Sequence, residues 1–377
     1  MMKSDQNKLG MGLYIHIPFC IKKCAYCDFY SVSSEGLHDK YIDALNIQMK
    51  NLSKLYSDRF FDTVYIGGGT PTILEKSALE KLLNAVPSYF NISADCEFTI
   101  EANPATLDEN KLEVLLRGGV NRLSIGCQSA HDAELKILGR IHSFSDFVDT
   151  YHLSRKEGFK NISVDLMYAI PNQTAKSFID SIESITELSP EHLSVYGLKV
   201  EPNTLFYKNR DILQFPDEDE YCQMYLDASE LLARKGYNKY EVSNFSKNGF
   251  ESRHNLKYWQ MDDYLGLGPG AHSFVNGRRF AFSRDLVAYI DAVIANKEPP
   301  LSENSVISRN DLMSEEFMLN MRLTKGYSLD KGLPLDKNVL STYEKYGYVV
   351  IEGNNIRFTD RGFLVSNYIL SSLINFD

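Results

Sequence analysis

The chain of 377 residues is long enough for one large catalytic domain with a smaller appended module. A hydrophobic fraction of 44% and a charged fraction of 24% are ordinary for a globular protein and argue against extensive disorder. The net charge of −10 disfavours nucleic-acid binding, and the sequence has no run of about 18 apolar residues that would predict a membrane-spanning helix.

The N-terminal residues MMKSDQNKLG are polar and lack the apolar core of a signal peptide. They predict a cytoplasmic protein, in which the six cysteines are reduced thiols. The spacing of the cysteines therefore matters more than their even number.

Short strand-like runs alternate with amphipathic helical stretches over the first two thirds of the chain. Strands are predicted at residues 13–17, 63–66, 97–100, 122–125, 162–167 and 192–198. Helices are predicted between them at residues 40–55, 77–86, 108–116, 144–157 and 175–187. This order predicts parallel strands with right-handed crossovers. Six units are too few for a closed eight-fold barrel, so the predicted fold is α/β, a partial (β/α)6 TIM-like barrel.

The pattern changes after Arg234, which divides the chain into predicted regions 1–235, 236–300 and 301–377. The middle region is dense in Gly, Asn and aromatic residues, and GLGPGAHSF at 266–274 predicts tight turns. The last region predicts helices at 315–323 and 338–346, a hairpin turning at 353–354 and a helix at 362–373. This is a winged-helix-like α+β domain. Residues 306–377 carry eight Lys or Arg against nine Asp or Glu, which favours a lid or packing domain over a DNA-binding one.

Three of the six cysteines, Cys20, Cys24 and Cys27, form a C-x3-C-x2-C pattern directly after the first predicted strand. Thiolates on a tight loop are typical ligands of an iron–sulfur cluster, and three ligands leave one iron of a four-iron cluster open. A structural zinc site with His16 or a distant cysteine as fourth ligand is one alternative, and three coincidental thiols are another.

Polar or glycine-rich features follow the next predicted strands. Residues 67–69 are three glycines, and Thr70 follows them. Glu101 ends the third predicted strand, Gln128 ends the fourth, and Asp165 lies within the fifth. The carboxyl ends of parallel strands meet at one edge, where α/β folds hold their sites. The glycine run would let the backbone approach a ligand that a Cβ atom would exclude.

Four motifs, taken together, closely resemble those of the radical S-adenosylmethionine (SAM) superfamily. They are YIHIPFCIKKCAYCDF (14–29), GGGTPT (67–72), EANP (101–104) and GCQS (126–129). The resemblance is to the branch of oxygen-independent coproporphyrinogen III oxidases and the related HemW-type haem chaperones, and it gives residues 301–377 as a HemN-type domain. It implies a [4Fe–4S] cluster on the three cysteines, with SAM chelating the open iron and being cleaved to methionine and a 5′-deoxyadenosyl radical.

The same resemblance implies which residues lie near the cofactor. The predicted SAM-binding residues are Tyr14, Tyr26, Gly68, Gly69, Thr70, Glu101, Gln128, Arg140 and Asp165. Gly68 and Gly69 are expected to face its methionyl part. The other three cysteines are expected to be buried, apolar-like residues (Cys96, Cys127 and Cys222).

Two departures separate the branches. The oxidases carry a further cysteine two positions after the third ligand, and this chain has Phe29 at that position. The oxidases also carry a long N-terminal extension, whereas only nineteen residues precede Cys20 in this chain. HNLKYW (254–259) matches the HNxxYW motif of the branch, which makes His254 a candidate haem contact. The resemblance therefore favours a haem chaperone, with haem, a reductant protein and a haem acceptor protein as partners. The alternative is the oxidase, which decarboxylates porphyrinogen propionates and for which Lys199 and Arg140 are the candidate cations.

Overall fold

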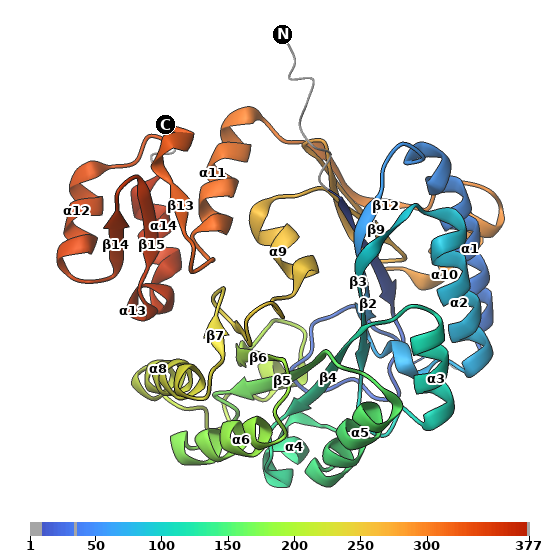
Figure 1. Cartoon of the computed structure of the whole chain (residues 1–377), viewed down its shortest axis with the longest axis horizontal. Coiled ribbons are helices and arrows are strands. Elements are labelled where there is room, and N and C mark those ends of the chain that lie inside the picture. Colours follow the sequence, from blue (N-terminus) through green and yellow to red (C-terminus); the bar gives the residue numbers. More distant parts are fainter. Residues whose placement is uncertain (1–9, 34–35, 375–377) are drawn as a thin grey trace.

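The computed structural model describes residues 10–33 and 36–374. Its core is a row of six neighbouring parallel strands: β1 (Met11–Ile17), β2 (Phe61–Gly68), β3 (Ile92–Ala102), β4 (Arg122–Gln128), β5 (Ile162–Tyr168) and β6 (His192–Gly197). The connecting helices cover its outer face (Figure 1): α1 (His38–Leu55), α2 (Lys76–Tyr89), α3 (Glu109–Arg117), α4 (Asp132–Leu138), α5 (Phe144–Glu157) and α6 (Ala175–Glu187). The predicted α/β partial barrel is confirmed.

Alternation along the strands separates the apolar layer from the interior of the barrel. In β1, Leu13 and Ile15 are fully buried and belong to the same apolar core as Tyr41 and Leu45 of α1. The intervening residues Tyr14 and His16 have the opposite orientation, because successive side chains point to opposite faces of a strand. Polar side chains therefore line the interior, and apolar ones hold the helices.

The middle region adds strands to both edges of the row. β7 (Asn238–Lys239) and β8 (Asn244–Ser246) extend the β6 edge, and β9 (Tyr264–Leu267), β10 (His272–Val275) and β11 (Arg278–Phe282) extend the β1 edge. GLGPGAHSF thus spans the ends of two strands and the turn between them. The region also forms α9 (Arg253–Gln260) and α10 (Leu286–Ile294). β12 (Leu301–Val306) pairs with β11, so the first residues assigned to the C-terminal domain belong to the large sheet.

The C-terminal domain contains α11 (Arg309–Asn320), β13 (Tyr327–Ser328), α12 (Lys337–Lys345), the hairpin β14 (Val349–Glu352) and β15 (Asn355–Phe358), α13 (Asp360–Leu364) and α14 (Ser366–Leu373). The hairpin turns where the sequence predicts, and the single predicted last helix is divided at Val365. The domain lies beside the barrel, with α11 next to α9 and α13 next to α8 (Glu218–Arg234) (Figure 1). Lys239 bridges the two parts through Asp360, at 2.7 Å between Nζ and Oδ1.

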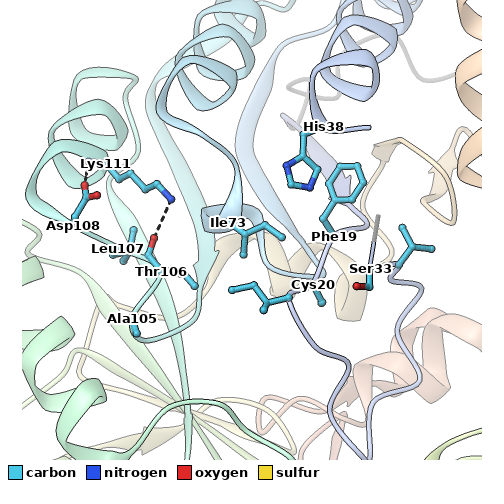
Figure 2. Close-up of a pocket in the computed structure, with 12 residues that line it drawn as sticks. Phe19, Cys20, Ser33, His38, Ile73, Ala105, Thr106, Leu107, Asp108 and Lys111 are labelled. Atoms are coloured by element: carbon cyan, nitrogen blue, oxygen red, sulfur yellow. Dashed lines mark hydrogen bonds between the residues drawn. The ribbon is translucent and has the colours of Figure 1, made fainter. Parts of the chain in front are cut away.

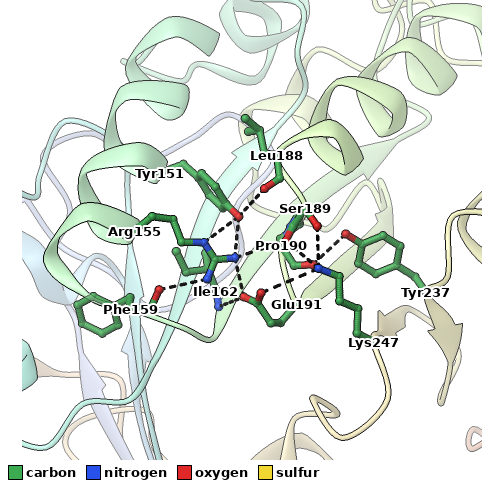
Figure 3. A network of polar contacts seen from close by, with 10 residues as sticks. All are labelled: Tyr151, Arg155, Phe159, Ile162, Leu188, Ser189, Pro190, Glu191, Tyr237 and Lys247. Atoms are coloured by element: carbon green, nitrogen blue, oxygen red, sulfur yellow. Dashed lines mark hydrogen bonds and ion pairs between the residues drawn. The ribbon is translucent and has the colours of Figure 1, made fainter.

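A polar network closes the amino ends of β5 and β6 (Figure 3). The guanidinium of Arg155 on α5 lies 2.7 Å from Glu191 Oε2 and also donates to the Tyr151 hydroxyl. Lys247 donates to the carbonyl of Ser189 at 2.9 Å. Hydrogen bonds and an ion pair from Arg155 and Lys247 therefore connect α5 and the residue after β8 to the segment before β6.

Within the described residues, no helix combines the length and the apolarity needed to cross a membrane.

Candidate functional site

A cavity of about 150 Å³ lies at the carboxyl ends of β1 to β5 and is called here the strand-end cavity. All but two of the predicted site residues line it: Cys20, Cys24, Tyr26, Cys27, Gly68, Gly69, Thr70, Glu101, Gln128, Arg140 and Asp165. These residues come from segments up to 145 positions apart, and they meet because parallel strands align their carboxyl ends.

The first wall of the cavity is the segment 18–32 that follows β1, called here the cysteine loop. Backbone hydrogen bonds tie its start to the glycine run, from Gly69 N to Ile17 O (2.8 Å) and from Thr70 N to Phe19 O (2.7 Å). Ala25, between the second and third cysteines, donates to the last turn of α4 and accepts from Phe206 N at 3.0 Å. The loop is therefore positioned by contacts to three parts of the barrel.

The three thiols line this wall without closing into a cage. The described residues contain no group of three His, Cys, Asp or Glu side chains that could hold a metal ion by itself. Cys20 Sγ lies 3.8 Å from Thr70 Oγ1, and Arg140 donates to Cys24 Sγ at 3.6 Å. Burial raises the pKa of Cys27 to about 11. A soft metal centre that binds thiolates would release these protons, so the donor set fits an iron–sulfur cluster.

His16 does not offer a fourth ligand to a zinc ion. Its Nε2 donates to the carbonyl of Tyr30 at 2.8 Å, and its Nδ1 accepts from the Tyr14 hydroxyl at 2.9 Å. Burial lowers the pKa of His16 to about 4, so the ring is neutral. Since both nitrogens already have partners, His16 acts as a brace of the cysteine loop.

The glycine run packs against protein in the directions where side chains would project. A Cβ atom on Gly68 would lie 2.4 Å from the His16 ring, and Gly68 has a φ of +113°. A Cβ atom on Gly69 would lie 2.5 Å from Phe19 O. These glycines let the cysteine loop pack on β2, and they line the cavity with backbone. Their contact with the methionyl part of SAM stays a prediction.

Glu101 lies at the cavity end of β3, and each of its carboxylate oxygens accepts one hydrogen bond from the protein. Oε1 accepts from the Tyr65 hydroxyl at 2.8 Å and Oε2 from Gly68 N at 3.0 Å. Burial raises the pKa of Glu101 to about 7, and these two hydrogen bonds oppose the rise. The carboxyl group is thus poised to change protonation near neutral pH and has acceptor capacity left for a ligand.

A second set of contacts positions the opposite wall. Arg140 Nη2 donates to Asn103 Oδ1 at 2.5 Å and to the carbonyl of Gly126 at 2.8 Å, and Asn103 donates to Thr70 Oγ1 at 2.7 Å. The chain of contacts runs from Arg140 through Asn103 to Thr70, beside Cys20. Asn103 is a cavity residue that the sequence reading missed, although it belongs to the EANP motif.

Gln128 supplies a buried polar atom that no protein group satisfies. It has a left-handed φ of 67° and is 8% exposed, and its Oε1 atom has no hydrogen-bond partner among the described residues. Asp165, which pairs with Gly126 across the sheet, has its pKa raised by burial and lies 3.4 Å from the hydroxyl of Ser124, a second missed cavity residue. An unsatisfied acceptor facing a polar cavity fits a ligand with hydrogen-bond donors, as SAM has.

Two predicted residues lie outside the cavity. Tyr14 is occupied by its bond to His16, and its ring stacks near Tyr65 at 6.3 Å. His254 on α9 is 1% exposed, with Nδ1 2.8 Å from Thr63 Oγ1 and Nε2 2.8 Å from the Tyr258 hydroxyl. Burial lowers its pKa to about 3. Haem ligation by His254 stays a prediction, and it requires the ring to leave both partners and α9 to move.

The other cysteines lie away from this wall. Cys96 and Cys127 are buried and donate to backbone carbonyls, as expected of apolar-like thiols. Cys222 on α8 is only half-buried. All six cysteines are free.

Comparisons with known proteins agree with this geometry. The model of the radical SAM superfamily matches residues 14–185. The heme chaperone HemW of Bacillus subtilis is 40% identical over 300 residues, covering 78% of this chain and 79% of that protein. HemW of Escherichia coli is 39% identical over 273 residues, covering 71% and 72%.

A solved structure gives the same fold. Coproporphyrinogen III oxidase (HemN) from Escherichia coli, a radical SAM enzyme, superposes with a TM-score of 0.85 over 96% of this chain and 89% of that one. Since the identity is 24%, this likeness establishes the architecture and carries no inference about activity.

Proposed function

The chain belongs to the HemW family of the radical SAM superfamily, and from that membership we propose that it binds haem and delivers it to an acceptor protein. The observation that carries the proposal is the identity of about 40% to HemW proteins over more than two thirds of both chains. Superfamily membership also implies a [4Fe–4S] cluster and SAM, and the strand-end cavity offers three thiols and a polar wall for them.

The roles of the chain's own residues follow from their contacts. Cys20, Cys24 and Cys27 would hold the cluster, and Arg140 would place a positive charge beside Cys24. Glu101, Gln128 and Asp165 would accept hydrogen bonds from the amino group and hydroxyls of SAM. When bound, the cluster and SAM would supply one-electron chemistry on the sulfonium group of SAM.

The alternative activity needs cations for porphyrinogen propionates, and the two named candidates are already engaged. Lys199 Nζ lies 2.5 Å from Glu201 Oε1, and Arg140 is directed at Asn103 and Gly126. Together with Phe29 at the position of the additional oxidase cysteine, these contacts favour the chaperone. A reductant protein for the cluster, an acceptor for haem and a cytoplasmic location remain parts of the proposal.

One experiment separates the two activities. The purified chain is reconstituted anaerobically with iron and sulfide and titrated with ferric haem, and a second sample is incubated with coproporphyrinogen III, SAM and reductant. Stoichiometric haem binding without formation of protoporphyrinogen is the expected result. Turnover of coproporphyrinogen III without haem binding would replace the proposal by the oxidase.

A further inference from the structure

A second cavity, of about 380 Å³, adjoins the cysteine loop and is called here the outer cavity (Figure 2). It lies between the start of α1, the short helix η1 (Pro71–Ile73) and residues 105–108 before α3. Cys20 lines both this cavity and the strand-end cavity. A ligand in the outer cavity would therefore be separated from the cluster site by little more than the cysteine loop.

The outer cavity has an apolar part and a polar part of similar extent. The apolar part includes Phe19, which is 1% exposed, together with Ile21, Val32, Ile73 and Leu107. Phe19 is fixed by an edge contact with Tyr41, with 5.4 Å between the ring centroids. The cavity volume lies within the range of sites for organic ligands, and the polar groups in its lining could fix the orientation of such a ligand.

One imidazole lines the outer cavity. His38, the first residue of α1, is half-buried and packs on Phe19 with 4.3 Å between the ring centroids. Neither of its ring nitrogens has a hydrogen-bond partner within the described part of the chain. His254, by contrast, has both nitrogens occupied. An imidazole nitrogen is a strong axial donor to haem iron.

A cation faces the same space. Lys111 on α3 donates to the carbonyls of Thr72 at 2.8 Å and Thr106 at 3.3 Å, and Figure 2 shows the second of these bonds. An ammonium group has three N–H donors, so one is left for an anion. The nearby carboxylate of Asp108 is engaged as the N-terminal cap of α3, where it accepts from the backbone N–H of Lys111 at 2.7 Å.

We infer that the outer cavity is the haem site, with His38 as axial ligand, Phe19 against the porphyrin face and Lys111 toward a propionate. This inference rests on the proposed haem-chaperone function and names the site at which it acts. Haem at this site would leave His254 in its hydrogen bonds with Thr63 and Tyr258. Haem at this position would lie beside Cys20, which brings the two redox centres together.

The test compares three full-length, cluster-loaded variants in an anaerobic titration with ferric haem. His38→Ala is expected to lose at least about tenfold in haem affinity and to shift the Soret band, while keeping the cluster absorbance. Millimolar imidazole should restore the wild-type Soret position in this variant, since it refills the vacant axial position. His152→Ala, an exposed histidine on α5, is the matched control, and His254→Ala is expected to bind haem like the wild type if it folds.

A second substitution probes the space itself. Ile73→Trp would fill the outer cavity and should block haem while leaving thermal stability close to that of the wild type. Unchanged haem affinity in both His38→Ala and Ile73→Trp would overturn the assignment. Loss of the cluster in His38→Ala, with no restoration of the Soret position by imidazole, would also overturn it. Wild-type protein that binds no haem would instead refute the proposed function, so the two failures are distinguishable.

Discussion

The two ends of the barrel differ in how their polar groups are satisfied. At the amino ends of the strands, Arg155 meets Glu191 at 2.7 Å and Phe159 O at 3.1 Å, and Tyr151 donates to Leu188 O (Figure 3). At the carboxyl ends, Gln128 Oε1 has no hydrogen-bond partner in the described part of the chain, and burial raises the pKa of Glu101 to about 7. The Arg155 network at the amino end is completed by protein groups, whereas the strand-end cavity at the carboxyl end has polar capacity that a ligand would complete. Substitutions at the two ends should therefore separate stability from binding.

The largest effect is expected at the cysteine loop. Cys24→Ser should abolish the four-iron absorbance and electron paramagnetic resonance signal, because serine is a poor ligand for a soft-sulfur site. Cys222→Ser, on α8, should leave both signals unchanged and serves as the control. An intact four-iron cluster in Cys24→Ser would contradict the three-thiolate assignment.

The glycine run links the cavity to the stability of the loop. Gly68→Ala should lower the free energy of unfolding by about 3 kcal/mol and reduce cluster occupancy, because the added Cβ meets His16. Gly158→Ala is the matched control. Gly158 has nearly the same φ, +114°, but open space around it, so about 1 kcal/mol is expected from backbone strain alone. Chemical denaturation measures both, and equal losses would show that the contact with His16 is unimportant.

At the amino end, the effect should appear in stability alone. Arg155→Ala removes charge-assisted hydrogen bonds to Glu191 and should cost about 2 kcal/mol in the free energy of unfolding. The affinity for SAM should not change, since the network lies at the other end of the strands. Denaturation and isothermal titration of the same sample measure the two quantities, and a parallel loss of affinity would break the separation of the two ends.

Gln128→Met should give the opposite result. The side chain keeps its length and loses the unsatisfied acceptor, so affinity for SAM should fall about tenfold. Stability should stay unchanged or rise slightly, because a buried polar atom without a partner is removed. Loss of stability with retained affinity would show that Gln128 serves the fold.

The smallest effect is a pH dependence. Because burial raises the pKa of Glu101 to about 7 from the ordinary 4.5, the folded chain binds more protons than the unfolded chain between these values. The free energy of unfolding without ligand should therefore fall as pH rises through this window. Affinity for SAM should rise, by at most about tenfold from pH 6 to pH 8, as the carboxylate forms. Glu101→Gln should flatten both profiles, and an unchanged slope in this variant would assign the titration to another group.

The sequence predicted the central fold well because its signals are local. The alternation of apolar runs placed the six parallel strands, and the position of each motif after a strand predicted that they would meet at one edge. The strands of residues 236–300 were missed. They have five residues or fewer, and β9, which contains Gly266, pairs with β1 far along the chain.

What the sequence determined by itself was the family, through its motifs, and the edge of the sheet at which those motifs meet, through strand order; the three cysteines as cluster ligands stay a prediction. Tertiary packing decided the rest. It buried His254 between Thr63 and Tyr258 and placed His16 where a side chain on Gly68 would project. It also left the ring nitrogens of His38, which lines the same cavity as Cys20, without a hydrogen-bond partner among the described residues. Whether a polar side chain is free for a ligand depends on which distant groups come within hydrogen-bond distance of it. Local patterns along the chain do not encode that distance.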